Sequence, residues 1–141
     1  MSMEMRVFFE GPLPPPTTVT KTMQQLGLNF LITDPVGGFD RNGFMPMSYG
    51  DGEVKRKTGT EVYLSSAKTT ITELGIDPML DREIAFRWGS DFIEGACAAA
   101  LSAAIAKLTN GVIWDGSVAE IISLESTINA CHDMVRAGTN P

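Results

Sequence analysis

The hydrophobic and polar positions of this chain change their period several times, and the longest apolar stretch lies between Phe86 and Asp115. Within it, Phe92–Leu108 carries only two charged residues, Glu94 and Lys107, and much of the remainder is alanine. A helix that lacks a wide polar face must be covered on several sides by other elements. The pattern therefore predicts a buried central helix over Phe92–Leu108, with a strand before it and a strand after it.

Other apolar runs, bounded by glycine, proline or Asp-Pro, predict the strands. These are Met5–Glu10, Leu28–Thr33, Met47–Tyr49, Glu61–Ser66, Glu83–Trp88 and Val112–Trp114. Helical spacing predicts one helix between Pro16 and Gly27 and a last helix over Val118–Val135, while Thr69–Leu74 fits either more strand or a helical turn. The chain is thus predicted to be a single α+β domain over residues 1–141, with a mixed or antiparallel sheet of about four to six strands packed with three helices.

Composition and charge narrow the classes of partner. The 141 residues are 43% hydrophobic and 20% charged, as expected for one globular domain, and the net charge is −6. Nucleic-acid binding depends on Lys and Arg neutralising phosphates, so an acidic chain disfavours it. An acidic chain suits a basic protein partner, because complementary potentials speed encounter.

The expected cellular compartment follows from two parts of the sequence, which are the first residues and the longest apolar stretch. The first residues, MSMEMRVFFEG, have no apolar stretch of signal-peptide length, and Glu94, Gly95 and Ser102 interrupt the apolar helix. We therefore expect a cytoplasmic protein with no membrane partner. The two cysteines, Cys97 and Cys131, are expected to be reduced, buried side chains, and a disulfide between facing helices stays an alternative.

No catalytic frame stands out. The glycines of GGFDRNG match neither a dinucleotide-binding nor a phosphate-binding loop, the acids of DPVGGFDRNG lack EF-hand spacing, and no GxSxG occurs. His132 and Asp133 are neighbours on a predicted helix and point about 100° apart. We therefore expect a non-enzyme without metal or cofactor. The alternative is a small enzyme or ligand-binding domain with a site assembled from Arg87, Asp91, Asp115 and His132.

The irregular, glycine-rich segment between Val36 and Gly59 is the candidate contact surface. It interleaves acids with apolar and aromatic residues, and aromatic anchors in a polar rim are typical of protein interfaces. The predicted partner-binding residues are Asp34, Phe39, Asp40, Phe44, Tyr49, Asp51 and Glu53. In the alternative interpretation, Phe39 and Phe44 pack under the loop and hold it against the sheet. Trp88 and Trp114 are expected in or beside the core, and an exposed pair would offer a second set of anchors.

A resemblance to a known family rests on the run from Arg82 to Gly116, REIAFRWGSDFIEGACAAALSAAIAKLTNGVIWDG. It resembles a pattern in small bacterial immunity-like proteins that accompany polymorphic and contact-dependent toxins, including the group that partners restriction-endonuclease-like toxin domains. The matching parts are the strand ending FRWG with Asp91, the alanine-rich helix and the closing TNGVIWD. In that pattern Gly often stands where Asn110 is found, and Pro often follows the final Asp.

The resemblance implies an immunity protein that binds a cognate bacterial toxin and blocks its active site or substrate groove, and the acidic charge of the chain suits a basic toxin. It assigns no contact residues, because the matching positions are those of a structural core. An oligomeric component of a secretion or phage-like assembly is a further alternative for a small α+β domain of this kind.

Overall fold

A computed structural model describes residues 3–36, 38–39, 42–50, 55–67 and 72–139. Within these residues the strands are β1 (Met3–Phe9), β2 (Phe30–Ile32), β3 (Gly43–Tyr49), β4 (Arg56–Ser66), β5 (Arg82–Trp88), β6 (Val112–Asp115) and β7 (Glu120–Ile122). The long helices are α1 (Pro16–Gln25), α3 (Phe92–Thr109) and α4 (Leu124–Thr139), and residues 72–74 form a short helical turn. The predicted α+β class is confirmed, but the described residues form seven strands, slightly more than the predicted four to six.

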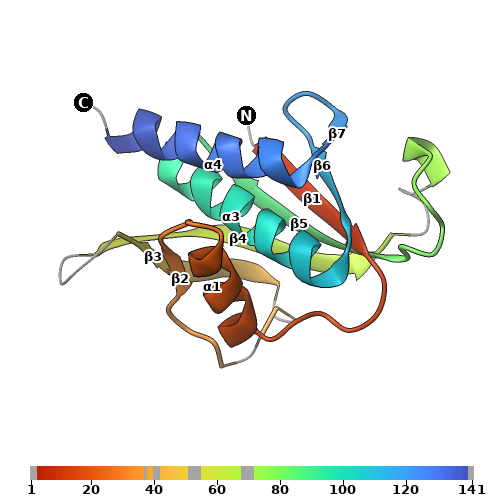
Figure 1. Ribbon diagram of the computed structural model, residues 1–141, viewed down its shortest axis with the longest axis horizontal. Coiled ribbons are helices and arrows are strands. Elements are labelled where there is room, and N and C mark those ends of the chain that lie inside the picture. Colours follow the sequence, from red (N-terminus) through yellow and green to blue (C-terminus); the bar gives the residue numbers. More distant parts are fainter. Residues whose placement is uncertain (1–2, 37, 40–41, 51–54, 68–71, 140–141) are drawn as a thin grey trace.

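The strands form one seven-stranded sheet in the order β2-β3-β4-β5-β1-β6-β7. Every neighbouring pair is antiparallel, and the first strand of the chain lies between β5 and β6. Figure 1 shows α1, α3 and α4 together on one side of this sheet, with α3 between the other two helices. Within the described residues, the opposite side of the sheet carries no long helix. An antiparallel sheet tolerates this because its side chains alternate between the two faces.

The central helix lies where its composition predicts. All residues from Gly95 to Ala106 are buried, because α3 is covered by the sheet, α1 and α4. Asp91 caps its start by accepting a hydrogen bond from the Ile93 backbone N–H at 2.8 Å, and Asn110 ends it with a φ of 58°. By length and composition α3 could cross a membrane, but 72% of that stretch is buried within the domain.

The prediction of a last helix over Val118–Val135 is wrong at its start. Glu120–Ile122 instead forms the edge strand β7, and α4 begins only at Leu124. The hydroxyl of Ser123 marks the change, because it accepts a hydrogen bond from the Ser126 backbone N–H at 3.0 Å and so caps the helix. Ile121 and Ile122 are β-branched and pair with Trp114 and Ile113 of β6. The local sequence pattern does not reveal this partner strand.

The irregular segment is also more regular than predicted. The expected short strand at Met47–Tyr49 is the end of β3, which starts at Gly43 and pairs along its length with β4. Its partner β4 begins at Arg56, which lies within the same segment. The strands of this segment were hard to predict because Pro46 of β3 faces Gly59 of β4. Both residue types normally weaken strands.

Both cysteines are free and buried, as predicted, and burial raises the pKa of Cys97 and of Cys131 to about 12. Only the thiolate reacts with disulfide reagents, so roughly one thiol in ten thousand would be reactive at pH 8. We expect a thiol reagent such as dithionitrobenzoate to label the native protein negligibly and to label both cysteines after unfolding in guanidinium. Labelling of native protein within seconds would contradict the buried placement of α3 against α4.

Candidate functional site: the open face of the sheet

The face of the sheet that points away from the helices, called the open face below, is the candidate functional surface. Strand register places its side chains in two rows that cross the sheet. The first row runs over β3, β4, β5 and β1 and consists of Phe44, Glu61, Arg87 and Glu4. The second row runs from β4 to β7 and consists of Tyr63, Ala85, Arg6, Trp114 and Ile121.

The alternation along β1 explains why charges reach this face. Met5 and Val7 are almost fully buried under the helices, so Glu4 and Arg6 point to the opposite side. The next residue on that side, Phe8, is also buried, because Ala67, Ile76 and the neighbouring apolar residues cover it. The segment around 72–81 therefore covers one end of the open face, where Trp114 packs against this cluster, and leaves the rest of the two rows uncovered.

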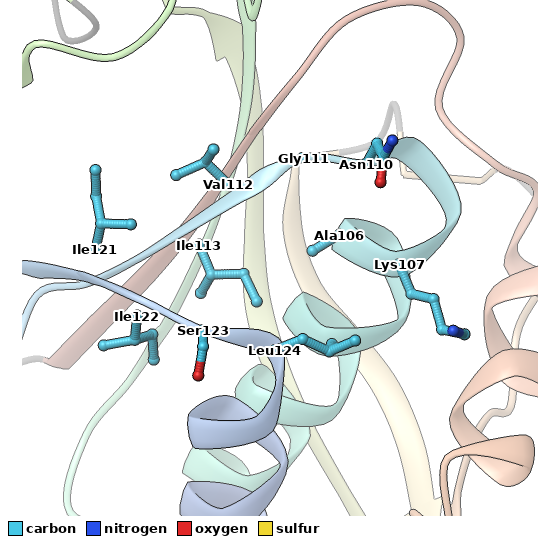
Figure 2. A pocket seen from close by; sticks show the side chains of 10 residues that line it. All are labelled: Ala106, Lys107, Asn110, Gly111, Val112, Ile113, Ile121, Ile122, Ser123 and Leu124. Carbon is cyan, nitrogen blue, oxygen red and sulfur yellow. The ribbon is translucent and has the colours of Figure 1, made fainter.

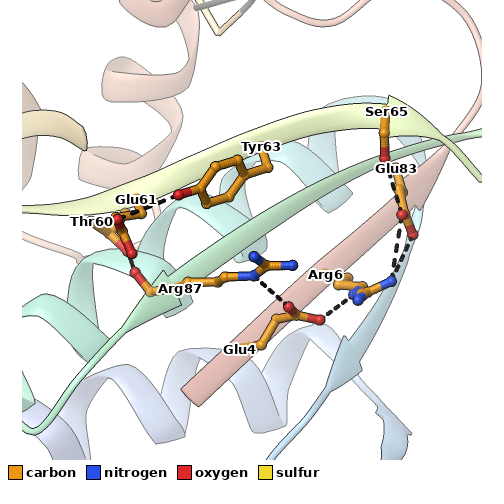
Figure 3. A network of polar contacts seen from close by, with 8 residues as sticks. All are labelled: Glu4, Arg6, Thr60, Glu61, Tyr63, Ser65, Glu83 and Arg87. Carbon is orange, nitrogen blue, oxygen red and sulfur yellow. Dashed lines mark hydrogen bonds and ion pairs between the residues drawn. The ribbon is translucent and has the colours of Figure 1, made fainter. Parts of the chain in front are cut away.

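Ion pairs connect the centre of the open face, as Figure 3 shows. Glu4 accepts a hydrogen bond from Arg87 Nε at 2.7 Å through one oxygen and binds the Arg6 guanidinium through the other. Arg6 Nη1 also lies 3.3 Å from Glu83 Oε2, and the Ser65 hydroxyl donates to Glu83 Oε1 at 3.1 Å. Two arginines and two carboxylates thus hold one another across β5 and β1.

Two aromatic rings extend this network at its ends. The guanidinium carbon of Arg87 lies 4.8 Å from the ring centroid of Tyr63, and that of Arg6 lies 5.6 Å from the ring of Trp114. Both distances are within the range of cation–π attraction. Tyr63, Arg87, Glu4, Arg6 and Trp114 therefore form a continuous stripe over four strands, which we call the arginine–aromatic stripe.

The electrostatics of the stripe favour fixed charges. Burial pushes the pKa of Glu4 upward, but hydrogen bonds and attraction from Arg6 and Arg87 outweigh burial, and the pKa lies below its ordinary value. Burial lowers the pKa of Arg6, and its bonds to Glu4 and Glu83 more than compensate, so that pKa is raised. Glu4 and Arg6 therefore stay ionised at neutral pH. Fixed charges of this kind favour recognition of a partner over proton transfer.

Exposed apolar side chains stand at both ends of the rows. Phe44 on β3 is 55% exposed and Ile121 on β7 is 54% exposed. The Phe44 ring lies over Gly59, where a Cβ atom would stand only 2.5 Å from Phe44 Cζ and 2.3 Å from the Met45 carbonyl oxygen. The glycine lets the ring lie flat on the sheet. Arg, Tyr and Trp with flanking apolar groups are the residues that dominate protein interfaces.

Of the predicted partner-binding residues within the described part of the chain, only Phe44 lies on the open face. Phe39 is 2% exposed in the core, so its prediction as a contact residue is wrong and its packing under the loop is confirmed. Tyr49 is half-buried on the helix side of β3, with its ring 4.9 Å from that of Phe30, and Asp34 is exposed just after β2. Three further acids, Asp40, Asp51 and Glu53, lie outside the described residues.

The four residues of the alternative enzymatic site do not converge. Asp91 and Asp115 line one groove, Arg87 belongs to the open face, and His132 lines a small hollow beside Tyr49. Among the described residues, no group of three or more His, Cys, Asp or Glu side chains could hold a metal ion.

A separate pocket of about 350 Å³ lies where α3 ends, between β6, β7 and the start of α4 (Figure 2). Its walls include Ile113, Ile122 and Leu124, and Lys107 is the one ionisable side chain among its described lining residues. The Ser123 hydroxyl also lines the pocket, and it is hydrogen-bonded to Ser126 at 3.0 Å at the start of α4.

Sequence reasoning missed the arginine–aromatic stripe because its members come from both ends of the chain. Glu4 and Arg6 stand in the first strand, and their partners lie about eighty residues later. One signal was present, since Glu and Arg alternate with apolar residues in MEMRVFF. That pattern marks a strand with one uncovered face, although it does not reveal which strands flank it.

No protein family, curated protein or solved structure gives a match to this chain. A function must therefore be inferred from the residues of the chain itself, and the open face offers the best candidate surface.

Proposed function

We propose that this chain is an immunity protein that binds a cognate bacterial protein toxin and blocks its active site or substrate groove without any covalent step. The observation that carries the proposal is the arginine–aromatic stripe, which is held in place by ion pairs and partly exposed on the open face. The resemblance of Arg82–Gly116 to immunity-like proteins agrees with this function. The compartment we propose is the cytoplasm.

The side chains of the stripe are already held in position, and this supports a binding role. Ordering a long side chain at an interface costs about 0.5–1.5 kcal/mol, and less is lost when the side chain is already held. Arg87 remains 42% exposed although Glu4 and Tyr63 fix its position. A partner would therefore meet an arginine and two aromatic rings in a geometry that needs little further ordering.

The size of the open face also fits a protein partner. Strands lie about 4.8 Å apart, so the six strands from β3 to β7 span roughly 24 Å. A standard interface covers about 800 Å² on each partner, which corresponds to a patch roughly 30 Å across. The toxin we propose is basic, because the net charge of −6 would steer a basic partner toward the chain.

The test is capture of the partner with matched variants. Tagged wild-type protein, Tyr63→Ala/Arg87→Ala and His132→Ala are used to purify bound proteins from the native cell, and each captured protein is then expressed alone and with the chain. We expect a protein whose toxicity the wild type suppresses, which is retained by His132→Ala on the helix side and lost by the double variant. If no captured protein is toxic, or if the double variant protects fully, the proposal is wrong.

A further inference from the structure

A second surface lies at the end of the domain where β1 starts and β5 ends. It is a groove of about 620 Å³ on the helix side of the sheet, bordered by the first turn of α3 and by α4. Trp88 is 8% exposed and forms its floor with Met3 and Met134, while Phe92 stands at its mouth with 54% of its surface exposed. This volume is in the range of sites that hold a ligand or a few large side chains.

Gly95 on α3 gives the floor its shape. A Cβ atom at this position would lie 2.6 Å from Trp88 Nε1 and 2.7 Å from Met134 Sδ, which are distances that real atoms do not adopt. The missing side chain lets the indole and the thioether approach α3 directly. The floor is therefore a broad, polarizable apolar surface made by an indole ring and methionine sulfur, which suits an apolar anchor of variable shape.

Three carboxylates, those of Asp91, Asp115 and Asp133, border the groove, and no basic residue is among the described residues that line it. Asp133 is paired with Arg136, and Asp91 has an exposed, loose pair with Arg56 at 3.7 Å. Asp115 accepts hydrogen bonds from the Ser117 backbone and hydroxyl at 2.9 and 2.7 Å, and it makes no ion pair within the described part of the chain.

We infer that this groove binds a basic segment of a protein partner that carries a large apolar anchor between its cations. The anchor packs on Trp88 and Met134, and Lys or Arg side chains beside it reach the rim carboxylates, chiefly Asp115. The acidic rim complements the charge of a basic segment, and the apolar floor complements its apolar anchor. The groove lies on the opposite side of the sheet from the open face, so the inference goes beyond the proposed function and does not depend on it.

The test uses three defined peptides and nuclear magnetic resonance of the whole chain. The probe is acetyl-Arg-Phe-Leu-Arg-amide, and the comparisons are acetyl-Glu-Phe-Leu-Glu-amide and acetyl-Arg-Ser-Ser-Arg-amide. We expect the probe alone to give saturable shifts of the Met3 and Met134 methyl groups and of the Trp88 indole N–H. Salt should weaken its binding, because exposed charges are screened.

Matched variants separate the rim from the general charge of the chain. Asp91→Asn/Asp115→Asn keeps the oxygens that accept the helix-cap and turn hydrogen bonds, and it should weaken the probe about tenfold. Glu10→Gln/Glu73→Gln changes the net charge equally at exposed positions outside the groove and should leave the affinity unchanged. Ala130→Trp, which fills the groove from α4, should abolish the shifts while the melting transition is retained.

Each opposite result overturns the inference. Absence of shifts with the probe means that the groove is not a binding site for such a segment. Equal shifts with the acidic peptide would show that the rim carboxylates do not select a basic segment. Equal shifts with the serine peptide would show that the apolar floor does not bind the anchor. A tenfold loss in the Glu10→Gln/Glu73→Gln control would show that only net charge matters.

Discussion

Replacing Ala100 with arginine is expected to prevent the domain from folding. Ala100 is fully buried in the middle of α3, and its neighbours on that helix, Ala99 and Leu101, are fully buried as well. The variant must place a charge and a long side chain where close packing leaves room for a methyl group. A loss of more than about 4–5 kcal/mol is expected, which is a large part of the roughly 5–15 kcal/mol by which folded proteins are stable.

The matched control is Ala137→Arg, which makes the same chemical change on an exposed position of α4. Surface substitutions of this kind change the free energy of unfolding by about 0.5 kcal/mol or less. Circular dichroism and thermal denaturation compare the two variants. A cooperative transition for Ala100→Arg within a few degrees of the wild type would show that α3 is not the central helix.

Replacing Arg6 with leucine should give the second largest loss. Arg6 binds Glu4 and Glu83, whose side chains are only 19% and 10% exposed, so its removal leaves two poorly hydrated carboxylates with fewer partners. Breaking a fully buried pair costs about 3–5 kcal/mol. Because these groups keep some water and Arg87 still binds Glu4, we expect a loss of about 2–3 kcal/mol at pH 7.

The loss should depend on pH in a definite direction. The pKa of Glu4 is lower in the folded protein than its ordinary value, so its ion pairs stabilise the wild type above the unfolded-state pKa of about 4.3. This stabilisation disappears as the pH falls through the lower folded-state pKa. The difference between wild type and Arg6→Leu should therefore be largest near neutral pH and should shrink below about pH 4.

Urea denaturation at several pH values measures this difference, with Arg136→Leu as the control. The Arg136–Asp133 pair is exposed on both sides, at 69% and 67%, and such pairs are worth about 0–1 kcal/mol. A difference between wild type and Arg6→Leu that is constant from pH 7 to pH 3 would mean that lost packing, and not the ion pairs, accounts for the effect.

Much of the fold could be predicted from the sequence because its signals are local. Asp91 and Asn110 mark the two ends of α3, and the alternation of Ile84, Phe86 and Trp88 defines the buried face of β5. The edge strand β7 was missed because Ile121 and Ile122 fit the apolar spacing of the helix that follows. Only pairing with β6, a tertiary contact, makes them a strand.

The candidate site was harder to predict because it depends on register between distant strands. Glu4 and Arg87 face each other only because β1 lies beside β5, and nothing near either residue signals that neighbour. The acidic and aromatic loop residues gave a stronger local signal, yet Phe39 turned inward to fill the core. Aromatic residues in a loop satisfy burial as readily as recognition, and local sequence does not separate the two.

The central claim, that the open face binds a protein toxin, is tested most directly by calorimetric titration of the captured toxin with Tyr63→Ala/Arg87→Ala and with His132→Ala. We predict that the double variant, after circular dichroism has shown that it is folded, binds at least about 30-fold more weakly than the wild type, because each truncated side chain is of the kind that dominates interfaces. His132→Ala, on the helix side, should bind as tightly as the wild type. Unchanged affinity in the folded double variant, together with a loss in His132→Ala, would contradict the claim and place the interface on the helix side.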